Sequence, residues 1–505
     1  MIKEHKFGII IIFLILGSLL SSELASNENS SLLIINAKII DGTGGAARLE
    51  SVRINGNRIQ ELGQLRPLPG EIILDATGLV LSPGFIDTHS HHDISIFNMP
   101  DALSATSQGI TTIVVGLDGF STVPLSNFFA KVKDNPLAVN IASYSGHNSL
   151  RNIVIGKDYQ RFSTPKEIEN MKNLLRLDMK AGALGLSTGL EYDPGIYSEE
   201  TDEVVALLEV FPEDQGRYAS HIRSEDVHLE SALDEFIEIS RKSKLPSQIS
   251  HIKLARRDLW GQTSWMINKL NAARHEGLDI TADIYPYTYY ESTMRTLFAK
   301  RDFDNRESAE FALTELVHPN QLTLSHYEPD PNLVGKTIAE IAVMRKEDPV
   351  TVLMNLIKED KTKTDSAIGV AMTQPDIDKL MQWEHSNICS DGALNNGHPR
   401  GRGAFARILA NYVRSRGILG WETAIHKMTQ LSALHMGFKN RGVIKSGAIA
   451  DLVLFDPEKI QDNATMDDIN RLSSGIINVW VGGELVYSDK KSTGLRPGQV
   501  IRRAD

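Results

Sequence analysis

The stretch that decides the fold of this chain is Pro83-Gly84-Phe85-Ile86-Asp87-Thr88-His89-Ser90-His91-His92-Asp93. Pro-Gly ends the apolar run Leu79–Ser82, and a second apolar run begins at Phe85. The second run predicts a buried strand that continues into His89 and His91. Side chains alternate along a strand, so these histidines face one side, where their nitrogens suit Zn²⁺ or a similar divalent ion. The alternative is a polar strand end without a ligand, but the acceptor-rich loop that follows favours a metal.

Length and charge limit what the rest of the chain can be. At 505 residues it is too long for one simple core, so we expect one large domain and a smaller one. The formal net charge of −11 argues against a nucleic-acid partner. Cys389 is the single cysteine, which excludes an internal disulfide and a cysteine-based zinc cluster.

The N-terminus has the pattern of a secretory signal. Lys3 and Lys6 precede an apolar run, Phe7–Leu20, that fits a signal better than a membrane span. We therefore expect residues 1–25 to be a signal peptide or an uncleaved N-terminal anchor. The protein would then be exported, periplasmic or secreted, and any membrane association would go through this segment alone.

Short β runs and tight turns occur at both ends of the chain. Asn55-Gly56 lies between two such runs, which is a hairpin signal. The same pattern returns around Gly482-Gly483. We predict that residues 32–83 and 436–499 pair into one small β-sandwich domain.

Between these ends, apolar β runs alternate with helical patterns. The candidate strands are Phe85–Thr88, Ile110–Gly116, Leu137–Tyr144, Leu184–Thr188, Arg217–Ile222, Ser247–Ile252, Ile280–Tyr285 and Ser386–Ser390. The helical patterns include Pro165–Ala181, Thr201–Phe211 and Trp260–Glu276. Eight strands in an α/β alternation predict a TIM-like (β/α)8 barrel over residues 84–435. Extra segments over residues 294–356 indicate an insertion near the last barrel strands, which could serve as a lid.

Reactive side chains gather at the ends of these predicted strands, where a TIM barrel carries its active site. They are His89, His91, Asp118, His221, His251 and Asp391. Each has an ordinary explanation alone, since a single histidine at a strand end is often only solvated and an Asp before Gly is often a turn residue. All six at equivalent positions favour a metal centre.

Several motifs resemble the amidohydrolase superfamily, and most closely its D-aminoacylase family, the N-acyl-D-amino-acid deacylases. They are Gly84–His91, Ser107–Thr112, Gly185–Tyr192, Ser220–Arg223, Ser250–Lys253, Asp283–Tyr287, Ser390–Gly392 and Gly447–Val453. The resemblance extends from about Leu32 to Arg502. It implies a hydrolase acting on carbon–nitrogen bonds other than peptide bonds.

The resemblance also implies roles for the metal-site residues. His221 and His251 would hold a tight Zn²⁺, and His89 and His91 would serve a second, weaker divalent metal. Asp391 would be the catalytic acid and base and would also touch the weaker metal.

Asp118 is a departure from the family, whose best-known members have a bridging cysteine at this position. A carboxylate can bridge two metals through its two oxygens, so the site remains chemically complete. It is a harder ligand than thiolate, which favours less thiophilic ions.

Substrate contacts follow partly from the resemblance, which assigns Tyr192, Tyr285 and Ser292 to the substrate pocket and Arg400 to the substrate carboxylate. Arg402 competes with Arg400 for that role. Lys253 would share a strand face with His251 if the strand continues. His147 either stabilises the oxyanion or is a structural loop histidine.

The leading hypothesis is an exported metal-dependent amidohydrolase that cleaves a small-molecule N-acyl-D-amino acid into a carboxylate and a D-amino acid. A second hypothesis is a cyclic-amide hydrolase or a D-dipeptidase on the same scaffold. A third is a catalytically inactive metal-binding barrel that acts as a binding protein. The presence of Asp391 beside a full ligand set argues against the third.

Overall fold

One sheet of nine strands joins the two ends of the described chain in this computed structural model, which describes residues 31–212, 215–394 and 397–503. The N-terminal part supplies β1 (Leu32–Ile39), β2 (Arg48–Asn55), β3 (Arg58–Gly63), β4 (Ile72–Asp75) and β5 (Val80–Pro83). The C-terminal part supplies β18 (Leu452–Phe455), β19 (Ile476–Val481), β20 (Glu484–Ser488) and β21 (Lys491–Ser492). The predicted signal segment, residues 1–25, lies outside the described residues.

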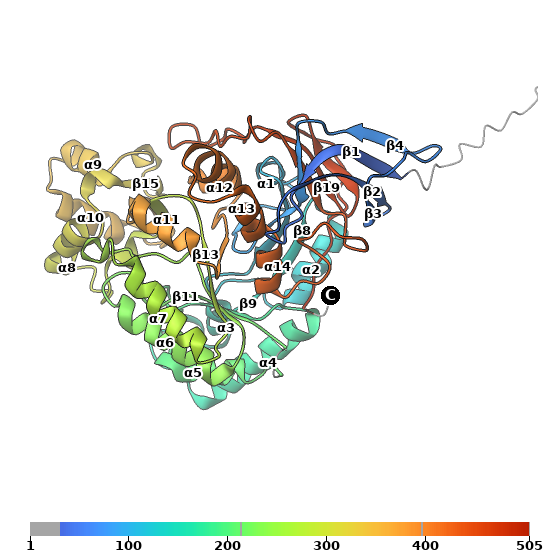
Figure 1. The fold of residues 1–505 in the computed structure, drawn as a ribbon. Helices are drawn as coiled ribbons and strands as arrows, with labels where there is room; N and C mark the ends of the chain where they lie inside the picture. The colour runs from blue at the N-terminus through green and yellow to red at the C-terminus, as the bar shows by residue number, and fades with distance from the viewer. Residues whose placement is uncertain (1–30, 213–214, 395–396, 504–505) are drawn as a thin grey trace, which may run out of the picture.

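The seam of this sheet lies between β5 and β18, which pair antiparallel with Val453 opposite Ser82. Figure 1 shows the blue N-terminal and red C-terminal strands side by side. The expected hairpin at Asn55 forms, with Asn55 paired to Arg58 across the turn. The structure thus pairs both chain ends, while their arrangement as a sandwich stays a prediction.

The middle of the chain is α/β, as predicted, and its strands run parallel. One sheet contains β6 (Phe85–Asp87), β7 (Ile110–Val115) and β8 (Asn140–Ser143). The other contains β9 (Ser145–Gly146), β10 (Leu186–Gly189), β11 (Tyr218–His221), β12 (Ser247–Ile249), β13 (Ile280–Ile284) and β17 (Ser386–Ile388). Each of the eight candidate strands is present, and side chains between the strands and the helices form the largest buried core.

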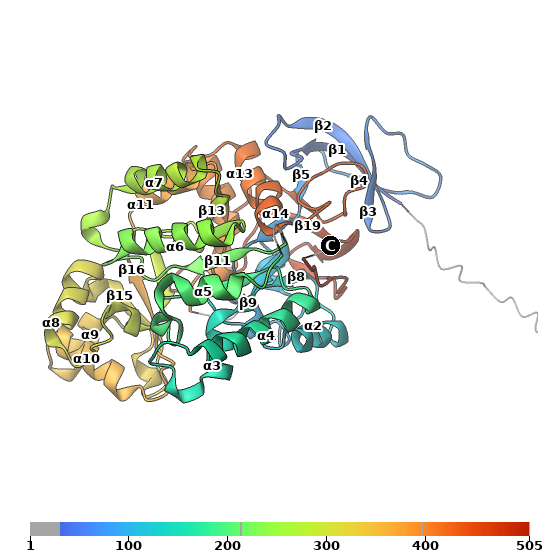
Figure 2. The same cartoon turned by 90° about the horizontal axis from the view of Figure 1, so that it is seen from below.

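Helices cover the outside of these strands (Figure 2). They are α1 (Leu103–Thr106), α2 (Leu125–Asp134), α3 (His147–Val154), α4 (Pro165–Ala181), α5 (Glu200–Leu208), α6 (Leu229–Ser243), α7 (Thr263–His275), α11 (Gln374–Gln382), α12 (Arg400–Arg407), α13 (Trp421–Met428) and α14 (Gln430–Met436). The bounds of α4 match the prediction because both ends carry strong signals. Thr164 and Glu167 form a capping box, and Gly182 ends the helix at φ 109°. None of the described helices is long and apolar enough to cross a membrane.

Residues 289–370 lie between β13 and β17 in the sequence and form what we call the inserted module, while β13 and β17 themselves pair directly. It contains β14 (Tyr289–Ser292), β15 (Leu322–His326) and β16 (Ser366–Val370) with α8 (Arg306–Phe311), α9 (Ile338–Arg345) and α10 (Pro349–Glu359). Tyr289 pairs with Val370, so both ends of the module meet in one antiparallel sheet. The module has its own apolar core and lies at the far side of the molecule from β1–β4 (Figure 1).

Candidate metal centre

The loops after β6 and β17 are joined by backbone hydrogen bonds and carry three of the expected site residues, His89, His91 and Asp391. β6 ends at Asp87, so our prediction that the strand runs through His89 and His91 is wrong. Hydrogen bonds between the loops replace the strand ladder: His91 N–H donates to the Gly392 carbonyl (2.8 Å), and Asp391 N–H donates to the His89 carbonyl (2.9 Å). The two histidines therefore face Asp391 although neither is in a strand.

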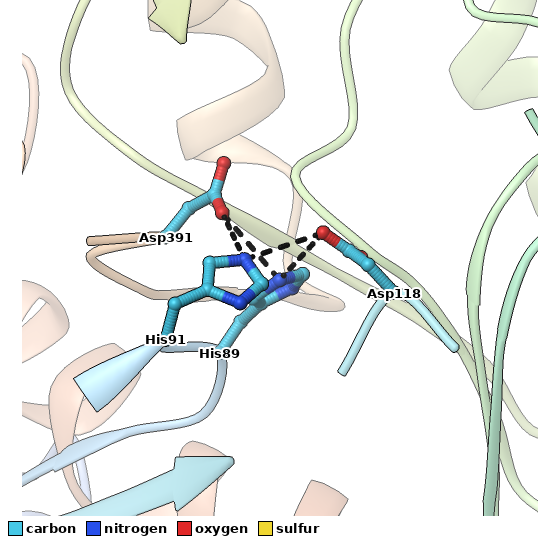
Figure 3. Close-up of side chains that lie close together, drawn as sticks. All are labelled: His89, His91, Asp118 and Asp391. Atoms are coloured by element: carbon cyan, nitrogen blue, oxygen red, sulfur yellow. Dashed lines mark ion pairs between the residues drawn. The ribbon is translucent and has the colours of Figure 1, made fainter. Parts of the chain in front are cut away.

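Four side chains come together where these two loops meet (Figure 3). Nε2 of His89 lies 3.4 Å from Oδ2 of Asp118 and 3.5 Å from Oδ1 of Asp391. Nε2 of His91 lies 3.4 Å and 3.2 Å from the same two oxygens. Their ligand atoms are close enough together to hold one ion. We call His89, His91, Asp118 and Asp391 the first cluster.

Asp118 also belongs to a second cluster, with His221 and His251. Its other oxygen, Oδ1, lies 3.4 Å from Nε2 of His251. Nδ1 of His221 lies 3.0 Å from the same Nε2. The carboxylate of Asp118 thus presents one oxygen to each cluster, which is the arrangement expected of a bridging ligand. This geometry is consistent with the proposal that a carboxylate can replace the family's bridging cysteine.

The atoms of these clusters suit a cation. Both ring nitrogens of His89 and Oδ1 of Asp118 are buried without a hydrogen-bond partner among the described residues. Burial lowers the pKa of His91, but the carboxylates of Asp118 and Asp391 outweigh this effect and raise it to about 9. Buried imidazoles gathered around carboxylates attract protons or a divalent ion, and imidazole with carboxylate is a common donor set for zinc.

Two carboxylates that the sequence analysis did not single out support the second cluster. Nε2 of His221 lies 2.7 Å from Oε2 of Glu191, and Nδ1 of His251 lies 3.0 Å from Oε1 of Glu225. Such carboxylates fix the tautomer and orientation of ligating histidines. Glu191 lies within the motif Gly185–Tyr192, and Glu225 follows His221 by four residues, but nothing in the sequence showed their contacts with the histidines.

A pocket opens directly beside the second cluster. Tyr192, Lys253, Tyr285 and Ser292 line it together with His221, His251 and Asp391. The ammonium of Lys253 donates to both oxygens of Glu225, at 2.6 Å and 2.7 Å. β12 ends at Ile249, so our assumption that the strand continues to Lys253 is wrong, and a turn brings this residue to the site.

Of the remaining predicted residues, one lies beside the pocket and two make contacts elsewhere. Arg400 lies beside the pocket, with Nη1 2.6 Å from Oδ2 of Asp391 and its guanidinium over the ring of Tyr285. Arg402 instead donates to the carbonyl of Leu394. Nε2 of His147 lies 2.7 Å from Glu203, away from both clusters and from the pocket lining.

Comparisons with known proteins agree with the resemblance seen in the sequence. A model of the amidohydrolase family matches residues 73–487. The chain is 31% identical over 504 residues to a D-aminoacylase of Alcaligenes xylosoxydans xylosoxydans, covering 95% of this chain and 99% of the relative. It is 33% identical to an N-acyl-D-glutamate deacylase of the same organism, covering 94% and 97%.

A solved structure matches the fold over nearly its whole length. It is an N-acyl-D-glutamate deacylase from Bordetella bronchiseptica in complex with zinc and a phosphonate inhibitor that mimics the tetrahedral intermediate. The TM-score is 0.84 at 32% sequence identity, with 93% of this chain and 99% of that chain covered.

Proposed function

Since this chain belongs to the amidohydrolase family, we propose that it is a metal-dependent hydrolase that cleaves N-acyl-D-amino acids into a carboxylate and a D-amino acid. One observation carries this proposal: Asp391 lies at the first cluster, lines the pocket and contacts Arg400. A single carboxylate therefore faces the metal ligands, the reacting bond and the group expected to hold the substrate. The similarity to D-aminoacylases and deacylases supports the D-configured substrate.

The cofactor that fits these residues is zinc, the metal in the related solved structure. His221, His251 and Asp118 would hold one ion, and His89, His91 and Asp391 with the second oxygen of Asp118 would hold another. Such an ion, when bound, acts as a Lewis acid toward an amide carbonyl and lowers the pKa of water.

The proton transfers fall to Asp391. Burial raises its pKa, but the charges of Arg400 and His251 outweigh burial and hold it below its usual range. Asp391 is therefore ionised at neutral pH and can accept a proton from the attacking water. It then donates this proton to the leaving nitrogen as the carbon–nitrogen bond breaks, which regenerates the carboxylate.

The substrate carboxylate would bind at Arg400, beside Asp391. The Arg400 guanidinium and the Tyr285 hydroxyl both have buried polar atoms without a hydrogen-bond partner among the described residues. A guanidinium can bind a carboxylate through two parallel hydrogen bonds. Arg402 also has a buried nitrogen without a partner, so the preference for Arg400 rests on its place beside Asp391 and over the ring of Tyr285, both of which line the pocket.

A closed barrel is the arrangement that we propose for the eight parallel strands. The hydrogen bonds that join the loops after β6 and β17 support it, because these are the first and last strands of the series.

We also propose export through residues 1–25, supported by Lys3 and Lys6 ahead of Phe7–Leu20. Cell fractionation should then find the protein outside the cytoplasm. Recovery of a cytoplasmic form with an intact N-terminus as the whole population would contradict this proposal.

The function is tested by turnover of matched substrates on metal-reconstituted protein. We expect N-acetyl-D-amino acids to be hydrolysed and their L-enantiomers to be hydrolysed far more slowly. Hydrolysis of cyclic amides or D-dipeptides with no action on N-acetyl-D-amino acids would assign the site to another reaction. A protein that binds metal and hydrolyses none of these substrates would be a binding protein.

A further inference from the structure

The pocket beside the second cluster is lined by more carboxylates than lysine or arginine side chains. Besides Asp391, the described residues that line it include Glu191, Glu225, Asp226 and Glu291, against Lys253 as the single lysine or arginine. The Lys253 ammonium is bound by both oxygens of Glu225, so these two charges cancel. The negative charges of Asp226 and Glu191 are not offset in this way.

Asp226 forms no close ion pair in the described parts of the chain, since Arg256, the cation that acts on it from a distance, is paired with Asp258. Asp226 is 8% exposed, its Oδ1 accepts hydrogen bonds from the Ser224 hydroxyl (2.7 Å) and from the backbone N–H of Val227, and it forms no ion pair within 4.0 Å of a described residue. Burial and the nearby charge of Glu191 raise its pKa to about 6, so it is still largely ionised at pH 7. A buried carboxylate without a counterion is unfavourable, and a ligand cation would relieve it.

Glu191 adds a second carboxylate to the same pocket. Its carboxylate oxygen Oε2 lies 2.7 Å from Nε2 of His221. In the role of a metal ligand, that imidazole is neutral and donates its hydrogen to Glu191. It therefore orients the carboxylate without cancelling its charge.

The rest of the pocket shows that a ligand with both a carboxylate and an apolar part would fit. Tyr285 lines the pocket, is 1% exposed, and its hydroxyl has no hydrogen-bond partner among the described residues. The ring of the same tyrosine lies under the Arg400 guanidinium, where a substrate carboxylate would bind. Leu297, Leu316 and Val317 of the inserted module supply an apolar wall to the same pocket.

We propose that the pocket selects substrates that carry a positive charge, which binds to Asp226 and Glu191 at the end of an apolar stem. The charge would come from a basic side chain, as in N-acyl derivatives of D-lysine, D-ornithine or D-arginine, or from a free amine on the acyl group. This proposal rests on the proposed N-acyl-D-amino acid hydrolysis. It also separates this chain from the 33%-identical relative that acts on D-glutamate, because a second substrate carboxylate would meet two buried like charges.

The first test compares substrates on the metal-loaded wild-type enzyme. N-acetyl-D-norleucine has nearly the stem of N-acetyl-D-lysine without the charge, and glycyl-D-norleucine moves the charge to the acyl side. We expect one of the two charged substrates to exceed N-acetyl-D-norleucine in kcat/KM by about 10- to 100-fold, the worth of one buried charge-assisted contact. Which of them is faster identifies the source of the charge. N-acetyl-D-glutamate should be slower than N-acetyl-D-glutamine.

A variant then links the preference to the carboxylate. Asp226→Asn should reduce the ratio of charged to uncharged kcat/KM by a similar factor, because the amide can still accept the hydrogen bonds from Ser224 and Val227. Asp202→Asn is the matched control, with the same chemical change on an exposed side chain of α5, and should keep the wild-type ratio. A preference for N-acetyl-D-norleucine or N-acetyl-D-glutamate, or an unchanged ratio in Asp226→Asn, would overturn the proposal while leaving the deacylase function intact.

Ligand binding gives an answer that does not depend on turnover. Calorimetry on the metal-loaded Asp391→Asn variant, whose turnover is slow, should show tighter binding of N-acetyl-D-lysine or glycyl-D-norleucine than of N-acetyl-D-norleucine. Binding with this order but without hydrolysis by the wild-type enzyme would contradict the proposed function and support the cation subsite. Equal binding of the charged and uncharged ligands would overturn the subsite whatever the activity is.

Discussion

Replacement of Asp118 by alanine tests the bridging geometry directly. Its two oxygens lie 3.4 Å from nitrogens of different clusters, Oδ2 facing His89 and His91 and Oδ1 facing His251. The variant therefore reduces the first cluster from four residues to three and the second from three to two. Loss of a group that only supports a metal ligand lowers affinity about 10- to 100-fold. Loss of a ligand shared by both clusters should therefore lower metal affinity by at least about 100-fold.

The assay is metal content by elemental analysis after dialysis against a weak chelator, with wild type and three variants in parallel. Asp118→Ala should retain less metal than wild type at both sites. Asp118→Asn keeps the shape but loses the charge, and should retain an intermediate amount. Asp118→Cys supplies a thiolate, which should partly restore zinc binding. Wild-type metal stoichiometry in Asp118→Ala would refute the bridging role and leave Asp118 as a neighbour of the site.

Three further outcomes depend on other contacts of the same site. Asp391→Asn should keep the fold and the second-cluster metal but lower kcat about 10²–10⁴-fold, since it removes the acid–base group; near-wild-type kcat in a metal-loaded variant would remove that role. Arg400→Met should lower kcat/KM for N-acyl-D-amino acids roughly 30- to several-thousand-fold, as expected when one partner of a buried charged pair is lost. A neutral D-amide without the carboxylate should be affected far less, and equal losses on both substrates would make Arg400 structural. Glu191→Gln should weaken metal binding about 10- to 100-fold by releasing Nε2 of His221, as measured by calorimetric titration with zinc; unchanged affinity would show that this contact does not orient the ligand.

Much of the fold follows from patterns that are local in the sequence. α4 was predicted residue for residue because Thr164, Glu167 and Gly182 are adjacent to the ends they define. The parallel strands were predictable because a strand buried on both faces has a continuous run of apolar residues in its sequence. The eventual pairing of these strands is a long-range property and was inferred from their number and alternation.

The site was predictable only where a residue's role depends on its place at a strand end. His221 and Asp391 belong to this group. Glu225 was missed because its contact with His251 joins two loops, and no local pattern shows which loops meet. Lys253 shows the opposite error: strand alternation placed it near His251, the strand ends before it, and a turn brings it there nevertheless.

Three residues of the site have a strained backbone conformation that the amino-acid composition does not reveal. Asp118, His251 and Asp391 have φ values of 52°, 34° and 48°, a left-handed conformation that favours glycine. Buried hydrogen bonds hold it, among them Asp391 N–H to the His89 carbonyl and His251 N–H to the Asp283 carboxylate. These bonds aim all three side chains at the clusters.

The strain predicts an inverted order of stability for two substitutions at Asp118. In ordinary helix or strand positions glycine is less stable than alanine by about 0.5–1 kcal/mol, because it loses more freedom on folding. At φ 52° alanine keeps the strain of a Cβ while glycine releases it, which is worth about 1 kcal/mol. Neither variant has a carboxylate, so the comparison isolates the backbone. Asp118→Gly should therefore unfold at a higher denaturant concentration than Asp118→Ala in metal-free protein. If alanine is the more stable, the left-handed turn at Asp118 is not maintained in solution, and the carboxylate cannot reach both clusters.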